Sequence, residues 1–199
     1  MSDGRVNSMG PALTTELQAP TEVSDEALVK RLLGGQTQAG DELVRRYCGP
    51  LLRYLQHMVR SDQLAEELLQ QTWVSVLDHV DRFDAGGGGF KAWVYRIATN
   101  KANDHWRFRS REKAAGEGLK LVVEVQAPDA GANLETAEQV GRLRSAIEKL
   151  PENQRQVILL RYYSGLKFVE IAQTLGCPLN TALGRMHKAV QKLKQLLEV

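Results

Sequence analysis

Apolar residues recur at intervals of three and four positions over most of the chain, which is the spacing of amphipathic helices. Between 64 and 80 one stripe predicts a helix with a core-facing side. Its members are Leu64, Leu68, Leu69, Trp73, Val76, Leu77 and Val80. The opposite side carries Glu66, Glu67, Gln70, Gln71 and Asp78. This polar side is either a solvated face or a docking surface for another protein.

A second long helix is predicted from Phe90 to about 109, with an apolar stripe that runs from Trp93 to Ala102. A different face repeats basic and amide side chains at helical spacing, which suits contacts to phosphates and bases. These residues are Arg96, Asn100, Asn103 and Arg107. The aromatic residues Tyr95, Trp106 and Phe108 interleave with them. Such aromatic side chains either stack on unpaired bases or pack on the domain itself.

Four consecutive glycines, 86–89, precede this helix and predict a loop, because glycine is a poor helix former. The loop is either a flexible connector or a phosphate-binding turn. The Lys-Ser/Thr pair of a P-loop is missing, which favours the connector.

The C-terminal part of the sequence predicts three helices in close succession. Pro151 and Glu152 begin one of them, a usual place for proline, and Gly165 follows its end. A short helix at 168–175 is followed by the turn Gly176-Cys177-Pro178 and a longer helix. This longer helix has an apolar stripe at Leu179, Leu183, Met186, Val190, Leu193 and Leu197, and a facing stripe at Thr181, Arg185, Lys188 and Lys192. The pattern is typical of a helix-turn-helix, with a plain three-helix bundle as the alternative.

These elements predict an all-α protein of two small helical domains joined by a flexible linker. Residues 1–23 are rich in small and polar types and are predicted to be a disordered leader, and Ser24 is a suitable first helix cap. The first domain is expected at 24–111 and the second at 137–199. The linker 112–136 contains glycine, proline and a Val-rich stretch at 121–125 that only weakly indicates a strand.

The formal net charge of +2 hides two basic segments. Residues 91–113 and 137–199 are each net +5, and the stretch 112–136 is net −3. Because each basic segment coincides with a predicted helix, nucleic acid is a plausible partner.

Several classes of protein are excluded by what the sequence lacks. No apolar run approaches a membrane span and no secretory signal begins the chain, so we expect no membrane insertion and a cytoplasmic protein. The two cysteines, Cys48 and Cys177, are expected to be reduced thiols. The four histidines show no metal-ligand spacing, and no catalytic motif is present. We therefore expect no enzyme, no metal, no cofactor and no small-molecule substrate.

Segments from both predicted domains resemble one family, the bacterial extracytoplasmic-function (ECF) sigma factors. The C-terminal segments 150–157, 170–172 and 176–189 are similar to the helix-turn-helix domain of that family. Residues 65–73 resemble its helix that binds core RNA polymerase. Residues 81–84 and 90–100 resemble its promoter-melting segment. All of these segments occur in the order that the family has.

The resemblance implies a promoter-specificity subunit of RNA polymerase. Its partners would be core polymerase, promoter DNA melted at the −10 element and duplex at the −35 element, and an anti-sigma factor. The residues implied in polymerase binding are Glu67, Leu68, Gln70, Gln71 and Trp73. Those implied in −10 binding and melting are Phe83, Phe90, Tyr95, Arg96, Asn100, Asn103, Trp106 and Arg107. Those implied in −35 binding are Asn180, Thr181, Arg185, His187 and Lys188.

Two positions depart from the family pattern. Leu183 stands where many members carry a basic residue, and Gly184 stands where they carry serine, so the −35 preference is open. Two other functions remain as alternatives at this point. One is a helix-turn-helix regulator that never binds polymerase, and the other is a sigma-like decoy that titrates an anti-sigma factor.

Overall fold

The computed structural model describes residues 23–114 and 134–198, and within these two ranges every regular element is helical. The all-α prediction is therefore confirmed for the described part of the chain. The predicted leader up to residue 22, linker residues 115–133 and the Val-rich stretch 121–125 lie outside the described residues.

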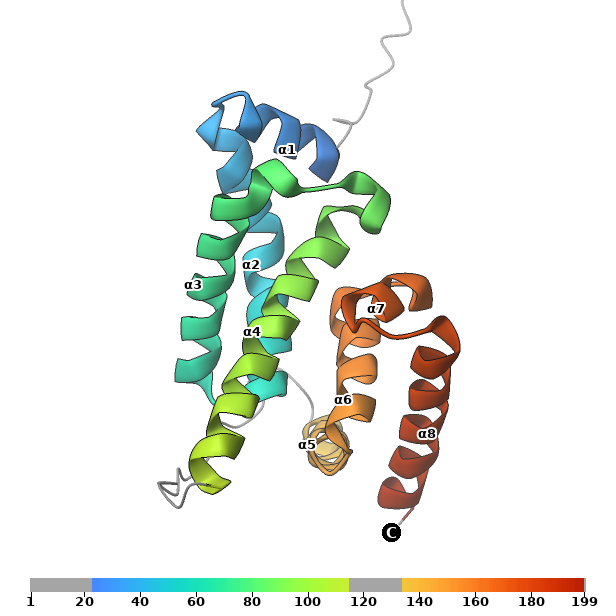
Figure 1. Ribbon diagram of the computed structural model, residues 1–199. Helices are drawn as coiled ribbons and strands as arrows, with labels where there is room; N and C mark the ends of the chain where they lie inside the picture. Colours follow the sequence, from blue (N-terminus) through green and yellow to red (C-terminus); the bar gives the residue numbers. More distant parts are fainter. Residues whose placement is uncertain (1–22, 115–133, 199) are drawn as a thin grey trace, which may run out of the picture.

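The first half of the described chain consists of three long helices side by side, with a short helix across one end (Figure 1). The short helix, α1 (Asp25–Leu33), begins at the predicted cap, where the Ser24 hydroxyl accepts a hydrogen bond from the Ala27 N–H at 3.3 Å. The long helices are α2 (Thr37–Val59), α3 (Asp62–His79) and α4 (Gly89–Ala114). Two single 3₁₀ turns, η1 (Val80–Arg82) and η2 (Ala85–Gly87), connect α3 to α4.

The second half is a compact set of shorter helices. They are α5 (Leu134–Glu148), α6 (Glu152–Leu159), the π-helical turn η3 (Leu160–Ser164), α7 (Phe168–Thr174) and α8 (Leu179–Leu197). Pro151 precedes α6 as predicted. Gly165 and Gly176 have positive φ angles of 66° and 59°, a conformation that favours glycine where a helix ends in a sharp turn.

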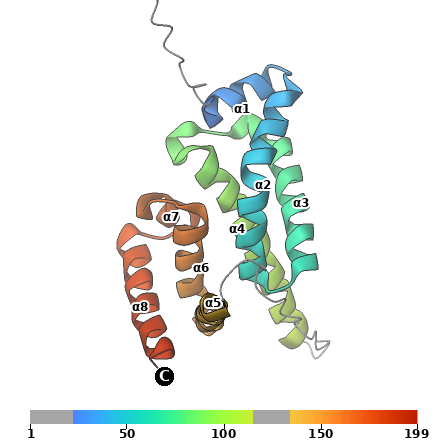
Figure 2. The ribbon, with the colours of Figure 1, turned by 180° about the vertical axis from the view of Figure 1, so that it is seen from behind.

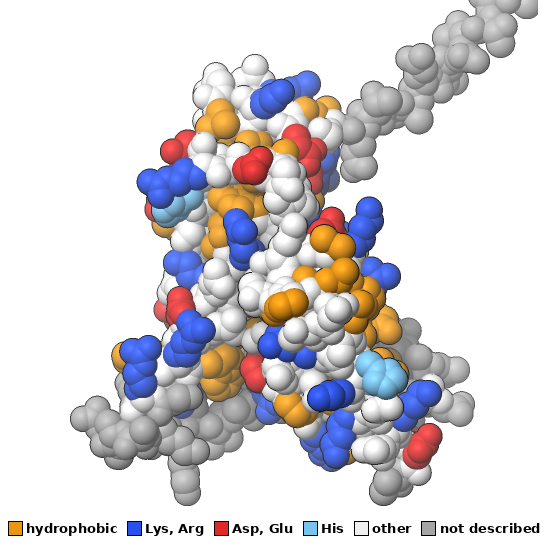
Figure 3. Space-filling view, turned by 45° about the vertical axis from the view of Figure 1, so that its right-hand side comes forward, with side chains coloured by type: hydrophobic (Ala, Val, Ile, Leu, Met, Phe, Trp, Pro, Cys, Tyr) orange, Lys and Arg blue, Asp and Glu red, His pale blue; other side chains and the backbone are white. Residues whose placement is uncertain are grey.

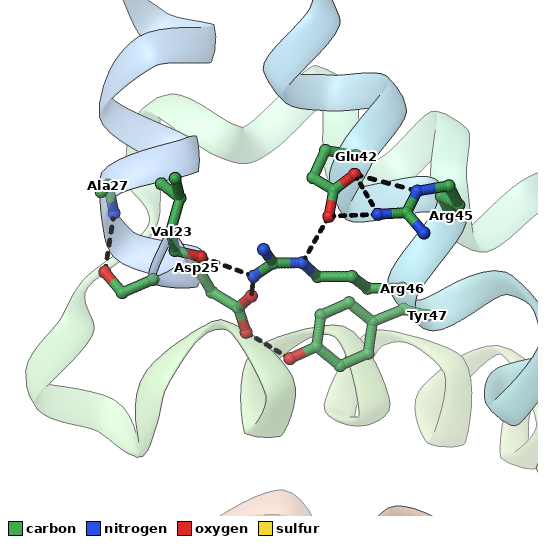
Figure 4. Close-up of polar contacts among 8 residues, drawn as sticks. Val23, Asp25, Ala27, Glu42, Arg45, Arg46 and Tyr47 are labelled. Atoms are coloured by element: carbon green, nitrogen blue, oxygen red, sulfur yellow. Dashed lines mark hydrogen bonds and ion pairs between the residues drawn. The ribbon is translucent and has the colours of Figure 1, made fainter. Parts of the chain in front are cut away.

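A polar cluster attaches α1 to α2 (Figure 4). The Arg46 guanidinium donates to an Asp25 carboxylate oxygen at 2.9 Å, to the Val23 carbonyl at 2.7 Å and to Glu42 at 2.8 Å. The Tyr47 hydroxyl donates to the other Asp25 oxygen. Hydrogen bonds from Arg45 and Arg46 lower the pKa of Glu42, so the cluster is charged at neutral pH. The cluster therefore fixes the direction in which the chain enters α1.

The amphipathic stripes are only partly buried. On α3, Leu68, Leu69 and Val76 are buried as predicted, but Leu77 is 55% exposed, so its assignment to the core is wrong. On α8, Leu179, Leu183 and Val190 of the apolar stripe are also exposed. The fully buried positions of α8 are instead two alanines, Ala182 and Ala189. Small side chains face the neighbouring helices because they permit a close crossing.

The two halves share one hydrophobic core. Helix α4 packs against α7, and α2 packs against α6 and η3 (Figures 1 and 2). The buried apolar residues of the second half that belong to the same cluster as those of the first are Val157, Leu159, Leu160, Leu166, Ile171, Ala172 and Ala182. The division into domains at 24–111 and 137–199 stays a prediction, and in this structure the helices of the two parts lie directly against each other.

Candidate nucleic-acid interface

The polar face of α4 is largely at the surface. Arg96, Asn100 and Arg107 are exposed, and Arg107 pairs with Asp104 at 3.3 Å. Asn103 is half-buried, and its side-chain oxygen accepts a hydrogen bond from the Gln156 amide at 2.7 Å. Three of these four polar side chains are therefore accessible, and the fourth, Asn103, is hydrogen-bonded to α6.

Two aromatic residues predicted to contact DNA lie in the core instead. Phe90 has no exposed surface, and its ring packs against Tyr47, Phe83 and Trp93 with centroid distances of 5.6, 5.9 and 5.8 Å. Tyr95 is 1% exposed and packs edge-on against Tyr54. Burial raises the pKa of Tyr95 to about 12. In this conformation neither ring reaches a base, although both support the surface above them.

The remaining aromatic candidates lie closer to the surface. Phe83 and Trp106 are half-buried, and the indole N–H of Trp106 is enclosed without a hydrogen bond among the described residues. Phe108, on the C-terminal part of α4, is 60% exposed. Aromatic side chains for stacking are thus available near Phe83 and toward the end of α4.

The glycine-rich loop has a definite turn structure. The Asp84 carboxylate accepts a hydrogen bond from the Gly86 N–H at 3.0 Å. Gly88 and Gly89 have φ angles of 96° and 77°, which other residues rarely adopt. A side chain on Gly88 would lie 3.1 Å from the Gln173 side chain of α7. The glycines therefore allow a tight turn and a close approach of the loop to α7. In this structure the loop is an ordered turn and not a flexible connector.

Helix α3 presents a mixed face to solvent. Glu67, Gln70 and Gln71 are exposed, and the Gln71 amide donates to Glu67 at 3.0 Å. Leu68 is buried and Trp73 is half-buried, so these two support the face rather than form it. Two apolar side chains, Val74 and Leu77, are 58% and 55% exposed. Neither exposure could be predicted from the sequence, because helical spacing alone does not show how far the core extends around a helix.

Helix α8 exposes the residues expected of a recognition helix. Asn180, Thr181, His187 and Lys188 are exposed, and the half-buried Arg185 donates to the Cys177 sulfur at 3.8 Å. A shallow hollow between α6 and α8 is lined by Asn153, Gln154, Thr181, Gly184, Arg185 and Lys188. Apart from the adjacent residues and the backbone of α8 itself, no atom lies within 4 Å of the position that a Gly184 side chain would occupy. Figure 3 shows Lys and Arg side chains scattered around apolar ones on this side of the molecule.

The described residues show no other kind of site. Within 23–114 and 134–198, no group of three His, Cys, Asp or Glu side chains is placed to hold a metal ion. No helix in these ranges is long and apolar enough to cross a membrane. Cys48 and Cys177 are both free and half-buried.

Two protein-family models match the chain: Sigma-70 region 2 matches residues 43–112, and Sigma-70, region 4 matches residues 141–193. The chain is also 32% identical over 135 residues to the ECF RNA polymerase sigma factor EcfG of Rhodopseudomonas palustris, across 68% of this chain and 72% of EcfG. The chain belongs to the ECF sigma factors. It is a sigma subunit of RNA polymerase, with region 2 in α2–α4 and region 4 in α5–α8.

The resemblance to sigma factors extends over most of the chain. The RNA polymerase sigma-H factor of Pseudomonas aeruginosa is 27% identical over 188 residues, which cover 89% of this chain and 96% of the relative. In fold, the chain is similar to the sigma factor RpoE of Bartonella quintana, solved in complex with the anti-sigma factor NepR. That match has a TM-score of 0.69 at 24% identity and covers 80% of this chain and 96% of RpoE.

Region 2 and region 4 of this sigma factor meet along a polar and apolar seam. The buried Arg155 donates to the Met58 carbonyl at 3.2 Å and pairs with Glu152. The Tyr163 hydroxyl and the His57 ring nitrogen are 2.5 Å apart, and the two ring centroids lie 4.6 Å apart with their planes tilted by 36°. Arg60 donates to the Glu148 carbonyl. Together with the Gln156–Asn103 hydrogen bond, these contacts define the region 2–region 4 seam.

The seam contains a histidine that is held neutral. Burial, and to a lesser extent the charge of Arg144 on α5, lowers the pKa of His57 to about 4. The facing Tyr163 hydroxyl of η3 is also neutral, because burial raises its pKa. Once exposed, His57 would titrate near 6.5. An opened or unfolded chain therefore binds more protons between these two values, and the folded, closed form loses stability as the pH falls through this window.

We expect the urea concentration at the unfolding midpoint to decrease as the pH is lowered from 7 to 4.5. His57 should account for the uptake of less than one proton on unfolding in this range. His57→Gln should flatten that part of the pH dependence. His79→Gln, at an exposed histidine, should leave it unchanged. Equal pH profiles for wild type and His57→Gln would contradict a neutral, half-buried His57.

Proposed function

We propose that this sigma factor divides promoter recognition among three exposed helical faces. The outer face of α3 binds core RNA polymerase, the polar face of α4 holds the melted −10 strand, and α8 reads the −35 duplex. The observation that carries this proposal is the simultaneous exposure of these faces on three helices, within the regions 2 and 4 that the family models match.

Melting needs no catalytic residue in this proposal. Base–aromatic stacking is worth ~1–3 kcal/mol per base, comparable to the roughly 1.4 kcal/mol of one base-pair step. Arg96, Asn100 and Arg107 hold the backbone of the separated strand, and Trp106 and Phe83 offer rings at the surface. A few captured bases therefore offset a few opened pairs. Phe90 and Tyr95 act by holding the glycine-rich loop and α4 in place.

Readout of the −35 element follows from the helix-turn-helix geometry. The turn at Gly176 brings α7 across α8, and the first turns of α8 carry Asn180, Thr181 and Arg185 toward base edges. Lys188 and His187 lie farther along the helix, where phosphates are expected. The open space beside Gly184 permits close approach of the DNA backbone, which fits glycine at this position.

In vitro transcription tests the proposal directly. The purified chain is added to bacterial core polymerase on a pool of genomic promoter fragments, and the start sites are sequenced. Discrete starts that depend on the chain are expected, and they reveal both promoter elements. The absence of starts from a folded chain with active core, also after removal of residues 1–23, would reject the proposal.

The two exposed apolar residues of α3 are expected to contribute to polymerase binding. Val74→Glu with Leu77→Glu places two charges in the proposed interface and should weaken core binding at least tenfold, because burying a charge without a partner is strongly unfavourable. The thermal unfolding midpoint should stay unchanged. Leu33→Glu, at an exposed leucine of α1, is the matched control and should bind core normally. Normal core binding by the double variant would show that the polymerase-binding surface lies elsewhere.

Regulation by an anti-sigma factor is also part of the proposal. The fold match to RpoE, solved with the anti-sigma factor NepR, supports it. We further propose that the protein acts in the cytoplasm, where its polymerase is, and that it works by binding alone. Addition of a candidate anti-sigma protein to the transcription assay should abolish the start sites that depend on this chain.

A further inference from the structure

The second turn of α8 exposes an apolar side chain that the polar readout proposed above does not use. Leu183 is 40% exposed. Helical spacing places it beside Asn180 and His187, at i−3 and i+4, and both of these are exposed. An isolated exposed leucine is ordinary on a protein surface. This one lies between two side chains proposed to contact DNA, so binding of a duplex to α8 encloses it.

The next residue, Gly184, indicates the direction from which the duplex approaches. Ala182 is fully buried, and each residue of an α-helix turns the side-chain direction by about 100°, so position 184 points away from the packed side. Glycine inside a helix lowers its stability. The packing gives no reason for it here, because a side chain at 184 would meet only its chain neighbours and the α8 backbone within 4 Å. The glycine instead permits another molecule to approach the helix closely.

The two sides of Gly184 differ in chemistry. Thr181, Arg185 and Lys188 line the hollow toward α6 and can donate hydrogen bonds to base edges and phosphates. Leu183 lies on the other side and can donate none. The apolar group that a base pair presents in the major groove is the C5 methyl of thymine. Against a donor or acceptor, the leucine would exclude water without replacing its hydrogen bond, which is unfavourable.

We propose that Leu183 reads the C5 methyl group of a thymine in the −35 element. This inference rests on the proposed function of α8 and adds a base-specific contact to it. Leucine is shorter than arginine, and the missing side chain at Gly184 lets α8 lie deep enough in the groove for Leu183 to reach the methyl group. The contact displaces no counterion, so its discrimination should not change with salt concentration.

Replacement of thymine by uracil tests the contact, because it removes the methyl group and leaves every hydrogen-bonding group of the base pair in place. Each −35 thymine of a promoter found in the transcription assay is replaced in turn. The affinity of wild-type holoenzyme for each duplex is then measured by competition in fluorescence anisotropy, at low and at high salt. At one position the affinity should fall about fourfold at both salt concentrations, as expected for one buried methyl group.

Three variants assign this effect to Leu183. Leu183→Ala should bind the thymine and uracil promoters equally, with an unchanged thermal unfolding midpoint because the side chain is exposed. Val190→Ala is the matched control: it shortens a 37% exposed side chain of the same stripe, two turns farther along α8, and should keep the fourfold difference. Leu183→Arg should change the preferred base from thymine to guanine, whose O6 and N7 accept hydrogen bonds from a guanidinium.

Two results would overturn the role of Leu183 alone. One is normal initiation by wild type with no dependence on any −35 methyl group. The other is a methyl dependence that persists in Leu183→Ala, and a simultaneous loss of core binding by that variant would assign the leucine to a protein contact. If wild-type holoenzyme initiates at no promoter, the proposed promoter recognition itself fails, and this inference fails with it.

Discussion

Phe90→Ala is expected to destabilise region 2 by about 3–5 kcal/mol, the usual cost of removing a fully buried phenylalanine. The ring has no exposed surface and contacts three other aromatic rings, which lie on α2, directly after η1, and on α4. Deleting it leaves a cavity at the junction of these elements. Urea unfolding followed by circular dichroism measures the loss.

Phe108→Ala is the matched control for this prediction. It removes the same side chain from the same helix, but at a position that is 60% exposed, so its effect on stability should stay within about 0.5 kcal/mol. The comparison also separates two roles for Phe90. A Phe90→Ala protein of normal stability with altered −10 preference would mean that the ring leaves the core to contact DNA.

Arg185→Ala and Lys188→Ala are expected to weaken −35 duplex binding, by ~1–3 kcal/mol where the lost contact is to a base. Because Lys188 lies where phosphates are expected, its loss should weaken binding to all sequences equally and reduce the slope of log affinity against log salt concentration by about one. Trp106→Ala should leave duplex affinity nearly intact and reduce open-complex formation, because its half-buried ring belongs to the −10 surface.

Fluorescence anisotropy with a −35 duplex and permanganate footprinting of the −10 region measure the two effects separately. Lys194→Ala, which removes an exposed positive charge in the last turn of α8, is the control for a general loss of charge. Equal effects of all three test variants on duplex binding would refute the division of labour between α4 and α8.

Local features of this fold could be predicted because their causes lie within a few residues. The Ser24 cap, the Pro151 start of α6 and the Gly176 turn each depend on the backbone chemistry of one position. The buried positions Leu68, Leu69 and Val76 of α3 follow from helical spacing. The family could also be identified from the sequence, because short motifs of both regions occur in one chain and in the order that the family has.

The exposure of apolar side chains could not be predicted, because it depends on which neighbour covers each helix. Leu77 and Leu183 continue apolar stripes, yet both lie beyond the edge of the packed surface. Ala182 and Ala189 are buried instead, because close helix crossings require small side chains. For the same reason, the aromatic residues near α4 could not be divided by sequence into core residues such as Phe90 and exposed ones such as Phe108.

The sequence by itself determined the helices, their caps and turns, and the two basic segments, since local spacing and charge specify these features. Only the tertiary structure decided that the two regions close on each other. The contacts that hold them join residues 53 and 106 positions apart in the chain, Gln156 with Asn103 and Tyr163 with His57. Pairings at such separations leave no periodic trace in a single sequence, because they depend on the shapes of two surfaces that form only after each region has folded.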